Sequence, residues 1–372
     1  MPSEAVRVLI AAGGTGGHIM PAVAAAEAIN ALAEARFLFV GTGRPAEAAI
    51  LGPLGYKRER LDVIGLKGKG ILGLPKALWK AFLAIIKSIS LIRSFKPDLC
   101  LVTGGYVCGP VGVAAFMSGT PLVLHEQNSR PGLTNRWLSR LAKLVFLGFR
   151  EAASSFDAAK VRVVGNPVRA EIEALSGSER DFQAKPSVIL ILGGSQGAKS
   201  LNQAALELAR VLKQKGTAIS FIHQTGESEL LEVEKAYREL GVEATVKAFF
   251  SDMVWVYKTA HLAISRAGAL TIAELCACRL PSVLVPLPTA ADDHQTINAL
   301  SLVDAGIARL VKQQDLHKGA LIETAAKLLE NPAELAQMSK KAKSIAKTDS
   351  ATVMAKTSLE LIGKRQGDID RH

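Results

Sequence analysis

His18 closes a glycine-rich run, Gly-Gly-Thr-Gly-Gly-His at residues 13–18, where its imidazole could transfer protons. Residues 6–12 before the run are β-rich, and Pro21 is predicted to open an alanine-rich helix that reaches about Glu34. A helix N-terminus favours the neutral imidazole, which can accept a proton from an attacking hydroxyl group. We therefore predict that His18 is a general base, with packing or capping of the turn as the alternative role.

A second glycine loop, Gly-Gly-Ser-Gln-Gly-Ala at residues 193–198, follows the apolar run at residues 188–192. Backbone N–H groups in such a loop can bind phosphate, and the hydroxyl group of Ser195 could add a donor. Ile19 occupies the place of the last glycine of a dinucleotide fingerprint, and Ala198 that of the glycine before a P-loop lysine. Hydride transfer and nucleoside triphosphate hydrolysis are therefore disfavoured.

The order strand, glycine loop, helix occurs twice, because a helical run at about residues 201–215 follows the second loop. Helical patterns separate most other strand candidates, which is typical of parallel sheets covered by helices. We therefore predict an α/β protein with two Rossmann-like units in tandem. The further strand candidates are residues 36–40, 99–103, 121–124, 142–147, 219–223, 262–265 and 281–285.

Turn residues between the two halves, Gly-Asn-Pro-Val-Arg at residues 165–169, indicate a domain boundary. We predict an N-terminal domain over residues 1–166 and a C-terminal domain over residues 167–350. A helix at about residues 351–364 could pack on either of them. The length of 372 residues agrees with two domains of ordinary size.

The formal charge of +11 favours an anionic partner, such as a phosphorylated substrate or an anionic membrane. Nucleic acid is disfavoured, because only 5% of the residues are aromatic and no zinc-finger spacing occurs. The four cysteines, Cys100, Cys108, Cys276 and Cys278, form neither a CxxC pair nor a disulfide scaffold, which is typical of a reducing cytosol. The N-terminal residues lack a secretory signal pattern, so we expect the protein to stay inside the cell.

Five further motifs accompany the two glycine loops: Gly-Gly-Tyr-Val-Cys-Gly-Pro at residues 104–110, His-Glu-Gln-Asn at 125–128, Gly-Asn-Pro-Val-Arg at 165–169, Arg-Ala-Gly-Ala-Leu-Thr at 266–271 and Asp-His-Gln at 293–295. The seven motifs, which span about residues 6–300, resemble those of the MurG family of glycosyltransferases and occur in the same order along the chain. The resemblance implies the GT-B architecture, in which two Rossmann-like domains face an interdomain cleft. The N-terminal domain would face the membrane and bind the acceptor, and the C-terminal domain would bind the UDP-sugar.

The resemblance also implies a reaction. N-acetylglucosamine would pass, with inversion, from UDP-N-acetylglucosamine to the C4 hydroxyl group of the N-acetylmuramyl unit of undecaprenyl-pyrophosphoryl-MurNAc-pentapeptide, which is lipid I. The product would be lipid II, used in peptidoglycan synthesis for the bacterial cell wall. Such enzymes usually need no metal ion or other cofactor, and no Asp-x-Asp motif precedes the nucleotide region here. No oligomeric state is predicted.

Several side chains suit a UDP-sugar, and the resemblance gives them roles. The carboxylate of Glu274 matches the vicinal hydroxyl groups of a ribose, although its spacing from Thr271 also fits a capping box. Asn128 and Gln295 would contact the donor sugar through their amides. The remaining predicted donor-binding residues are Arg169 for the diphosphate, Phe250 for the uracil, and Thr15, Gly16, Gly17, Ser195, Ala269, Leu270 and Thr271.

Tyr106 and His125 are the predicted acceptor-side residues. His125 is also the alternative general base, and a structural hydrogen-bonding role is equally open for it. The base is therefore either His18 or His125.

A lipid acceptor implies peripheral association with the anionic cytoplasmic leaflet of the bacterial inner membrane. Residues 72–95 are unusually apolar, but lysines interrupt them before any run long enough to span a bilayer. At helical spacing these lysines share one stripe, which Trp79, Leu83 and Ile86 flank. We expect most of the apolar side chains to pack in the core while the Trp79 edge contacts lipid. The lysines are Lys76, Lys80 and Lys87.

Three other classes of protein remain open. A related glycolipid glycosyltransferase would share the fold but should lack the combined motifs at residues 104–110 and 125–128. A UDP-N-acetylglucosamine epimerase would have a similar two-domain fold without a lipid acceptor. A nonenzymatic nucleotide-sugar sensor would bind the donor and catalyse nothing.

Overall fold

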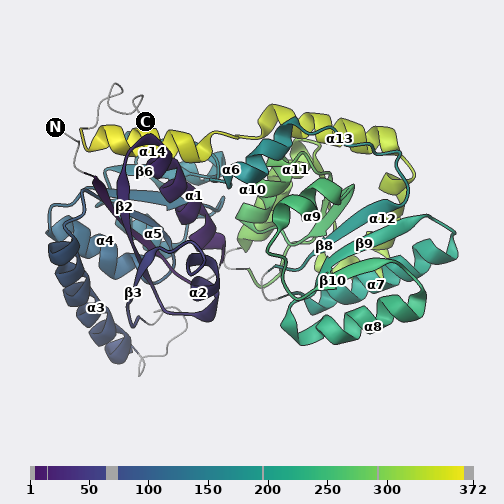
Figure 1. The fold of residues 1–372 in the computed structure, drawn as a ribbon, viewed down its shortest axis with the longest axis horizontal. Helices are drawn as coiled ribbons and strands as arrows, with labels where there is room; N and C mark the ends of the chain where they lie inside the picture. Colours follow the sequence, from purple (N-terminus) through teal and green to yellow (C-terminus); the bar gives the residue numbers. More distant parts are fainter. Residues whose placement is uncertain (1–4, 15, 64–73, 195–196, 291–292, 364–372) are drawn as a thin grey trace. The chain divides into compact units, whose positions relative to one another are not determined.

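The computed structural model describes residues 5–14, 16–63, 74–194, 197–290 and 293–363. The chain forms two compact units (Figure 1). Unit 1 contains the chain up to Arg169 and again from Asp349, and unit 2 contains Ala170 to Thr348. Each unit has its own parallel sheet with helices packed against it, so the predicted α/β class is confirmed.

Seven parallel strands form the sheet of unit 1: β1 (Val6–Ala12), β2 (Ala35–Gly41), β3 (Lys57–Arg60), β4 (Leu99–Gly104), β5 (Leu122–Glu126), β6 (Leu144–Leu147) and β7 (Val161–Val163). Their spatial order is β3-β2-β1-β4-β5-β6-β7. Val8 of β1 lies opposite Phe37 of β2 on one side and opposite Leu99 of β4 on the other. The chain therefore leaves β1 and β4 toward opposite edges, which creates a switch point between these two strands.

Two apolar cores lie on the two faces of this sheet, because alternate residues of a strand point to opposite faces. Val8 and Ile10 join one core with α1, α2 and α14, whereas Leu9 and Ala11 join the other with α3, α4 and α5. These helices are α1 (Gly16–Leu32), α2 (Pro45–Leu51), α3 (Leu74–Phe95), α4 (Cys108–Met117), α5 (Leu133–Leu138) and α14 (Ser350–Leu361).

The last helix, α14, belongs to unit 1 although it follows the whole of unit 2 in the sequence. It packs beside α1 (Figure 1), where Met354 and Leu359 are buried. The hydroxyl group of Ser350 donates a hydrogen bond to the carbonyl oxygen of Val164 at 2.7 Å. This contact anchors the start of the helix to unit 1.

The prediction that Pro21 opens the first helix is wrong, because α1 begins at Gly16 and contains Pro21 in its second turn. A proline there cannot donate to the carbonyl oxygen four residues earlier, which belongs to Gly17. The missing bond is confined to the first turn of the helix. Ile19 is fully buried against the sheet, and this packing favours the earlier start.

Unit 2 repeats the strand arrangement of unit 1. Its six parallel strands are β8 (Ser187–Leu192), β9 (Ile219–Gln224), β10 (Ala244–Lys247), β11 (Leu262–Ser265), β12 (Ser282–Leu284) and β13 (Ala308–Leu310), in the order β10-β9-β8-β11-β12-β13. A second switch point therefore lies between β8 and β11. The helices are α6 (Ala170–Glu173), α7 (Lys199–Gln214), α8 (Leu230–Leu240), α9 (Met253–Thr259), α10 (Ala269–Ala277), α11 (His294–Asp304), α12 (Ala320–Leu329) and α13 (Pro332–Ile345).

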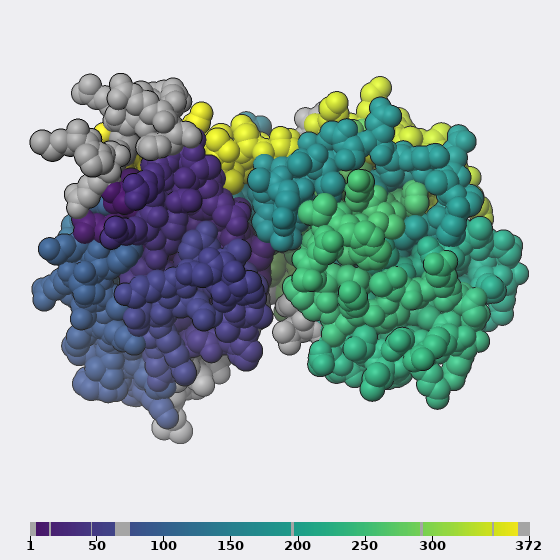
Figure 2. Space-filling view, viewed as in Figure 1, coloured from purple at the N-terminus to yellow at the C-terminus, as the bar shows by residue number. Residues whose placement is uncertain are grey.

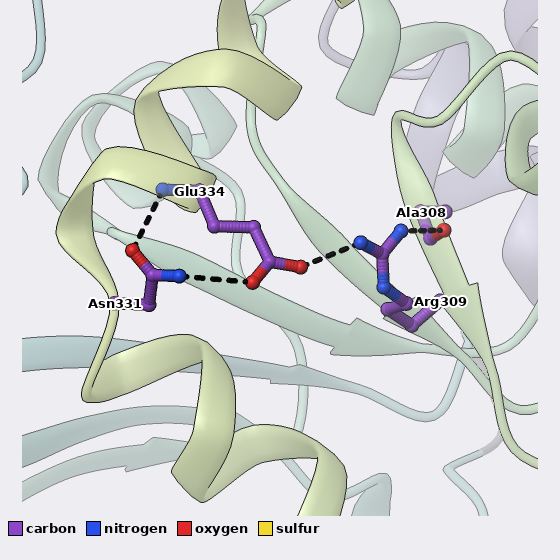
Figure 3. A network of polar contacts seen from close by, with 4 residues as sticks. All are labelled: Ala308, Arg309, Asn331 and Glu334. Atoms are coloured by element: carbon purple, nitrogen blue, oxygen red, sulfur yellow. Dashed lines mark hydrogen bonds and ion pairs between the residues drawn. The ribbon is translucent and has the colours of Figure 1, made fainter.

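Polar side chains fix the start of α13 against β13, the edge strand of unit 2 (Figure 3). The side-chain oxygen of Asn331 accepts a hydrogen bond from the N–H of Glu334 at 3.2 Å. The Asn331 amide donates back to one oxygen of the Glu334 carboxylate at 3.3 Å. The other oxygen accepts from the Arg309 guanidinium at 2.5 Å. Asn331 therefore caps the helix, with Pro332 in its first turn.

Large apolar side chains of α3 lie on both faces of the helix: Ile92 is buried and Ile89, Leu91 and Phe95 pack against the core, while five others are exposed, so the exposed edge is broader than the predicted Trp79 edge. Small residues of α3 are buried as well, Ala77, Ala84 and Ser88 among them, and they let the helix lie close to α4. This close packing leaves the five exposed side chains on the opposite face of the helix, and the segment containing α3 forms the blue surface of unit 1 in Figure 2. We call this set the α3 patch: Leu78, Trp79, Phe82, Leu83 and Ile86, each between 46% and 61% exposed.

Candidate active site

The loops that follow β1 and β4 touch at the switch point of unit 1. The N–H of Gly13 donates to the carbonyl oxygen of Gly104 at 3.2 Å. Gly105 has a φ of +89°, and a Cβ added to it would overlap the carbonyl oxygen of Gly13. A side chain at residue 105 would therefore push the two loops apart.

His18 lies in the first turn of α1 and is half-buried beside the end of β4. Its Nδ1 is 3.2 Å from the carbonyl oxygen of Thr103, and the Thr103 hydroxyl donates to the carbonyl oxygen of His18 at 2.8 Å. Because a carbonyl oxygen only accepts, Nδ1 carries the hydrogen in this contact, and Nε2 is the basic nitrogen. Gly104, with a φ of +125°, leaves room for the ring, which any Cβ at that position would overlap.

The two predicted acceptor-side residues lie in different surroundings. His125 is in β5 with 0% of its surface exposed, and burial lowers its pKa to about 3. Its ring is therefore neutral at physiological pH and enclosed in unit 1. Tyr106 lies in the turn between β4 and α4 and is 51% exposed, so a ligand can reach it.

Glu126 holds the loop that carries Asn128. One oxygen of its carboxylate accepts from the backbone N–H of Asn128 at 2.9 Å and from its side-chain amide at 3.3 Å. The other oxygen accepts from the N–H of Gly132 at 3.1 Å and from the Asn135 amide at 2.9 Å. This buried carboxylate thus fixes the direction of the Asn128 side chain.

In unit 2, Gln224 at the end of β9 joins the second glycine loop to the segment that contains Phe250. Its Nε2 donates to the carbonyl oxygen of Gly194 at 3.1 Å, and its Oε1 accepts from the N–H of Phe250 at 3.1 Å. The ring of Phe250 is only 3% exposed, whereas that of its neighbour Phe249 is 58% exposed. Phe250, which is predicted to lie beside the uracil, is therefore almost fully covered, with Trp255 and Lys247 against its ring.

Glu274 lies in the second turn of α10, which follows Gly268 at the N-cap position. Because Thr271 is the third residue of the helix, it cannot form a capping box with Glu274, and that alternative is wrong. One oxygen of the Glu274 carboxylate instead accepts a hydrogen bond from the hydroxyl group of Tyr257 at 2.7 Å. Ala269, Leu270 and Thr271 form the first turn of α10.

The other predicted residues lie at the ends of elements. The side-chain oxygen of Gln295, in the first turn of α11, accepts from the N–H of Leu287 at 3.0 Å. Arg169 is half-buried immediately before α6, and Gly16 and Gly17 begin α1. Thr15 and Ser195 lie outside the described residues.

The structure gathers the described site residues into two groups, each at the carboxyl ends of the strands of one unit. Among the described residues, no three His, Cys, Asp or Glu side chains lie close enough together to hold a metal ion.

Arg266, part of a predicted motif, stays inside unit 2 and ties its loops together. Its guanidinium donates to the carbonyl oxygens of Val285 at 3.1 Å and Pro286 at 3.3 Å. It also donates to the Ser200 hydroxyl at 3.1 Å and to the Gln313 side chain at 2.7 Å. These contacts give Arg266 a structural role.

Comparisons with known proteins identify the family. The model of the glycosyltransferase family 28 N-terminal domain matches residues 8–147, and that of the C-terminal domain matches residues 188–354. A protein of Myxococcus xanthus (strain DK1622), named UDP-N-acetylglucosamine--N-acetylmuramyl-(pentapeptide) pyrophosphoryl-undecaprenol N-acetylglucosamine transferase, is 39% identical over 97% of this chain and 94% of its own length. The protein of that name from Chromohalobacter salexigens is 43% identical over 93% of this chain and 94% of its own. The crystal structure of Acinetobacter baumannii MurG has a TM-score of 0.75 and 31% identity, and the match covers 95% of this chain and 99% of that one.

This chain belongs to the MurG family. It is therefore a hexosyltransferase of glycosyltransferase family 28, as the sequence motifs predict. The GT-B fold itself occurs more widely. A UDP-N-acetylglucosamine 2-epimerase structure reaches a TM-score of 0.68 at 15% identity, which shows a shared fold alone.

Two side chains that support the MurG-family site are not predicted from the sequence. Gln127 donates through Nε2 to the same Thr103 carbonyl oxygen that His18 contacts. The backbone carbonyl oxygen of Gln127 accepts a hydrogen bond from the side-chain amide of Asn166 at 3.0 Å. This bond joins the motifs at residues 125–128 and 165–169. Gln127 belongs to the motif at residues 125–128, but the sequence does not predict its contacts, because they depend on the fold.

Glu47 is the second. It is 5% exposed in α2, and it accepts hydrogen bonds from the N–H groups of Gly14 at 3.1 Å, Thr42 at 3.0 Å and Gly43 at 2.7 Å, and from the Thr42 hydroxyl at 2.6 Å. The carboxylate therefore ties the first glycine loop to the loop after β2. An acidic residue in the first turn of a helix is common, so the sequence gives no distinct signal for this role.

Desolvation by burial raises the pKa of Glu47, but the hydrogen bonds from Thr42, Gly14 and Gly43 outweigh it and hold the pKa below 4.5. A carboxyl group with a pKa lower in the folded than in the unfolded state stabilises the fold above its unfolded pKa. That stability is lost as the pH falls through the folded pKa.

Replacing Glu47 by glutamine should lower the free energy of unfolding by about 1–3 kcal/mol at neutral pH. The side-chain NH2 group of the glutamine would face backbone N–H groups that now donate to a carboxylate oxygen. The difference from wild type should shrink in acid as the wild-type carboxylate takes up a proton. Urea unfolding at neutral and acidic pH measures both effects. Glu207→Gln, at an exposed ion pair on α7, is the matched control and should change stability little. Equal stability of wild type and Glu47→Gln at every pH would contradict this role.

Proposed function

We propose that this chain transfers N-acetylglucosamine from UDP-N-acetylglucosamine to the C4 hydroxyl group of the N-acetylmuramyl unit of lipid I, and so forms lipid II. The observation that carries the proposal is the nearly full-length match, at 39% and 43% identity, to relatives named for this transfer. The position of His18 supports it, because its basic nitrogen is fixed beside the first glycine loop. In this proposal unit 1 binds mainly the acceptor, and unit 2 binds mainly the UDP-sugar.

His18 accepts the proton of the C4 hydroxyl group at Nε2 while that oxygen attacks the anomeric carbon from the face opposite UDP. The bond from the anomeric carbon to the diphosphate oxygen breaks, and UDP leaves with the electron pair. A single displacement of this kind inverts the configuration and gives a β-linkage. The Thr103 carbonyl oxygen at Nδ1 stabilises the imidazolium that forms, because a hydrogen bond from a charged ring is stronger.

On the donor side, Glu274 binds the ribose hydroxyl groups, and Gln295 and Asn128 bind the sugar. Arg169 and the positive end of the α10 dipole offset the charge that develops on the diphosphate. These groups belong to the protein itself, so the proposed reaction uses neither a metal ion nor another cofactor.

Incubation of the chain with labelled UDP-N-acetylglucosamine and a short-chain lipid I analogue should give a labelled product with the mass of the lipid II analogue. With the donor alone, the proposal expects the sugar to stay unchanged. Conversion of the donor to another epimer without transfer would replace the proposal by an epimerase. Binding of the donor without either reaction would indicate a sensor.

His18→Ala should lower turnover by about 10²–10⁴-fold, the usual contribution of a general base, and should change UDP affinity little. Steady-state kinetics with the lipid I analogue and calorimetry with UDP measure the two effects. His317→Ala removes an exposed histidine of unit 2 and serves as the control. Near-normal turnover in a folded His18→Ala protein would reject this base.

We further propose that unit 1 associates peripherally with the cytoplasmic face of the inner membrane through the α3 patch. Trp79 and Phe82 of the patch stack with their ring centres 5.7 Å apart. No described helix is long and apolar enough to cross a bilayer. Lys80 is paired with Asp62 at 2.7 Å, and Lys87 donates to the carbonyl oxygen of Arg60 at 2.7 Å, so part of the lysine stripe binds the protein itself.

A second exposed apolar and basic area lies on α5, on the same face of the sheet as α3. Trp137 is 70% exposed, and the Arg140 guanidinium lies 5.0 Å from its ring centre. Both border a cavity of about 620 Å³ together with Arg136 and Lys160. Cations beside exposed aromatic side chains suit the boundary between anionic headgroups and acyl chains.

The double substitution Phe82→Glu and Ile86→Glu should weaken binding to vesicles of phosphatidylglycerol and phosphatidylethanolamine by at least about tenfold, because each side chain loses apolar burial and gains repulsion. Vesicle sedimentation measures the binding. Leu231→Glu, at a residue 76% exposed on α8 of unit 2, is the matched control. Unchanged vesicle binding by the double variant would remove the α3 patch from the membrane surface.

A further inference from the structure

We propose that Tyr257 is a positioning residue for nucleotide recognition: its hydroxyl group orients the Glu274 carboxylate toward the ribose hydroxyl groups of the uridine. The inference rests on the proposed role of Glu274 in ribose binding. Tyr257 is only 1% exposed, so it acts on the nucleotide through Glu274 and not by direct contact.

The geometry of the pair supports this role. Tyr257 lies on α9 and Glu274 on α10, and the phenol donates to Oε2 of the carboxylate at 2.7 Å. A glutamate side chain has several rotatable bonds, and a fixed donor at one oxygen restricts them. Because a phenol is neutral, its hydrogen bond does not itself neutralise the carboxylate, and a carboxylate is a strong acceptor for sugar hydroxyl groups.

A half-buried cation holds the two helices together at their carboxyl ends. The Arg180 guanidinium donates to the carbonyl oxygens of Tyr257 and Lys258, both at 3.1 Å, and to that of Ala260. It also donates to the carbonyl oxygen of Cys278, the C-cap residue of α10, at 3.3 Å. Burial lowers the pKa of Arg180 to about 10, so it is still charged at neutral pH.

Two contacts at different positions along α9 and α10 therefore set the spacing of these helices. Arg180 fixes their ends, and the phenol of Tyr257 meets the carboxylate about one turn before the end of α10. This arrangement makes the position of the carboxylate a property of the folded unit, present before any nucleotide binds. Preorganisation of this kind increases affinity by reducing the ordering that binding requires.

Tyr257→Phe removes only the hydroxyl group and tests the inference in the full chain. Calorimetry should show UDP binding weakened by about 5- to 20-fold, less than the full loss of a hydrogen bond to a charged group would cause, because Glu274 itself remains. Binding of 2′,3′-dideoxy-UDP, which lacks the hydroxyl groups that Glu274 would contact, should change by less than about threefold. In transfer assays the KM for the donor should rise, while kcat at saturating donor should stay within about threefold.

Tyr237→Phe is the matched control, because Tyr237 is a buried tyrosine of the same unit whose hydroxyl lies 3.0 Å from Nδ1 of His223. It should leave the ratio of UDP to dideoxy-UDP affinity unchanged. The double variant Tyr257→Phe/Glu274→Ala should bind UDP no more weakly than Glu274→Ala alone, because both changes act on one contact.

Each other outcome overturns a distinct step. Wild-type UDP affinity in Tyr257→Phe, with weakened binding in Glu274→Ala, would reject the positioning role and keep Glu274 at the ribose. Wild-type UDP affinity in Glu274→Ala would reject the ribose contact and the inference with it. Equal weakening of both ligands by Tyr257→Phe, with a lower unfolding temperature, would assign Tyr257 a structural role only.

Discussion

Close contact between backbone loops at the carboxyl ends of the strands is the constraint on which the rest of the structure depends. In unit 1 the loops that follow β1 and β4 touch at the switch point, where Gly105 lies against Gly13. In unit 2 the loops that follow β8 and β9 touch, where Gly197 lies against the carbonyl oxygen of Thr225. His18 and the second glycine loop take their positions from these contacts.

Much of this framework follows from local sequence. Apolar runs bounded by glycine predict the central strands, because a buried parallel strand needs both faces apolar and its loop needs conformational freedom. Four short strands, β3, β7, β10 and β13, escape prediction. β3 reads Lys-Arg-Glu-Arg, and its place at the sheet edge comes from pairing with β2, which no local propensity encodes.

The site is predictable only in part, for a related reason. Motifs indicate His18, Asn128 and Glu274, but they do not show which atoms hold these side chains in place. The partners come from distant segments: Thr103 for His18 and Tyr257 for Glu274. Glu126 is a partner that is near in sequence, because it lies two residues before Asn128. Its second carboxylate oxygen nevertheless accepts from Gly132, which is farther along the chain. Such contacts depend on tertiary structure, and neither composition nor periodicity predicts them.

The placement of α14 affects how the chain can fold during synthesis. Unit 1 is complete only when α14 covers α1, and α14 is made after the whole of unit 2. Until then the apolar side chains that Met354 and Leu359 cover remain in water, whereas every residue of unit 2 has already been made. Unit 2 can therefore reach its native packing before unit 1, which is completed only after α14 has been made.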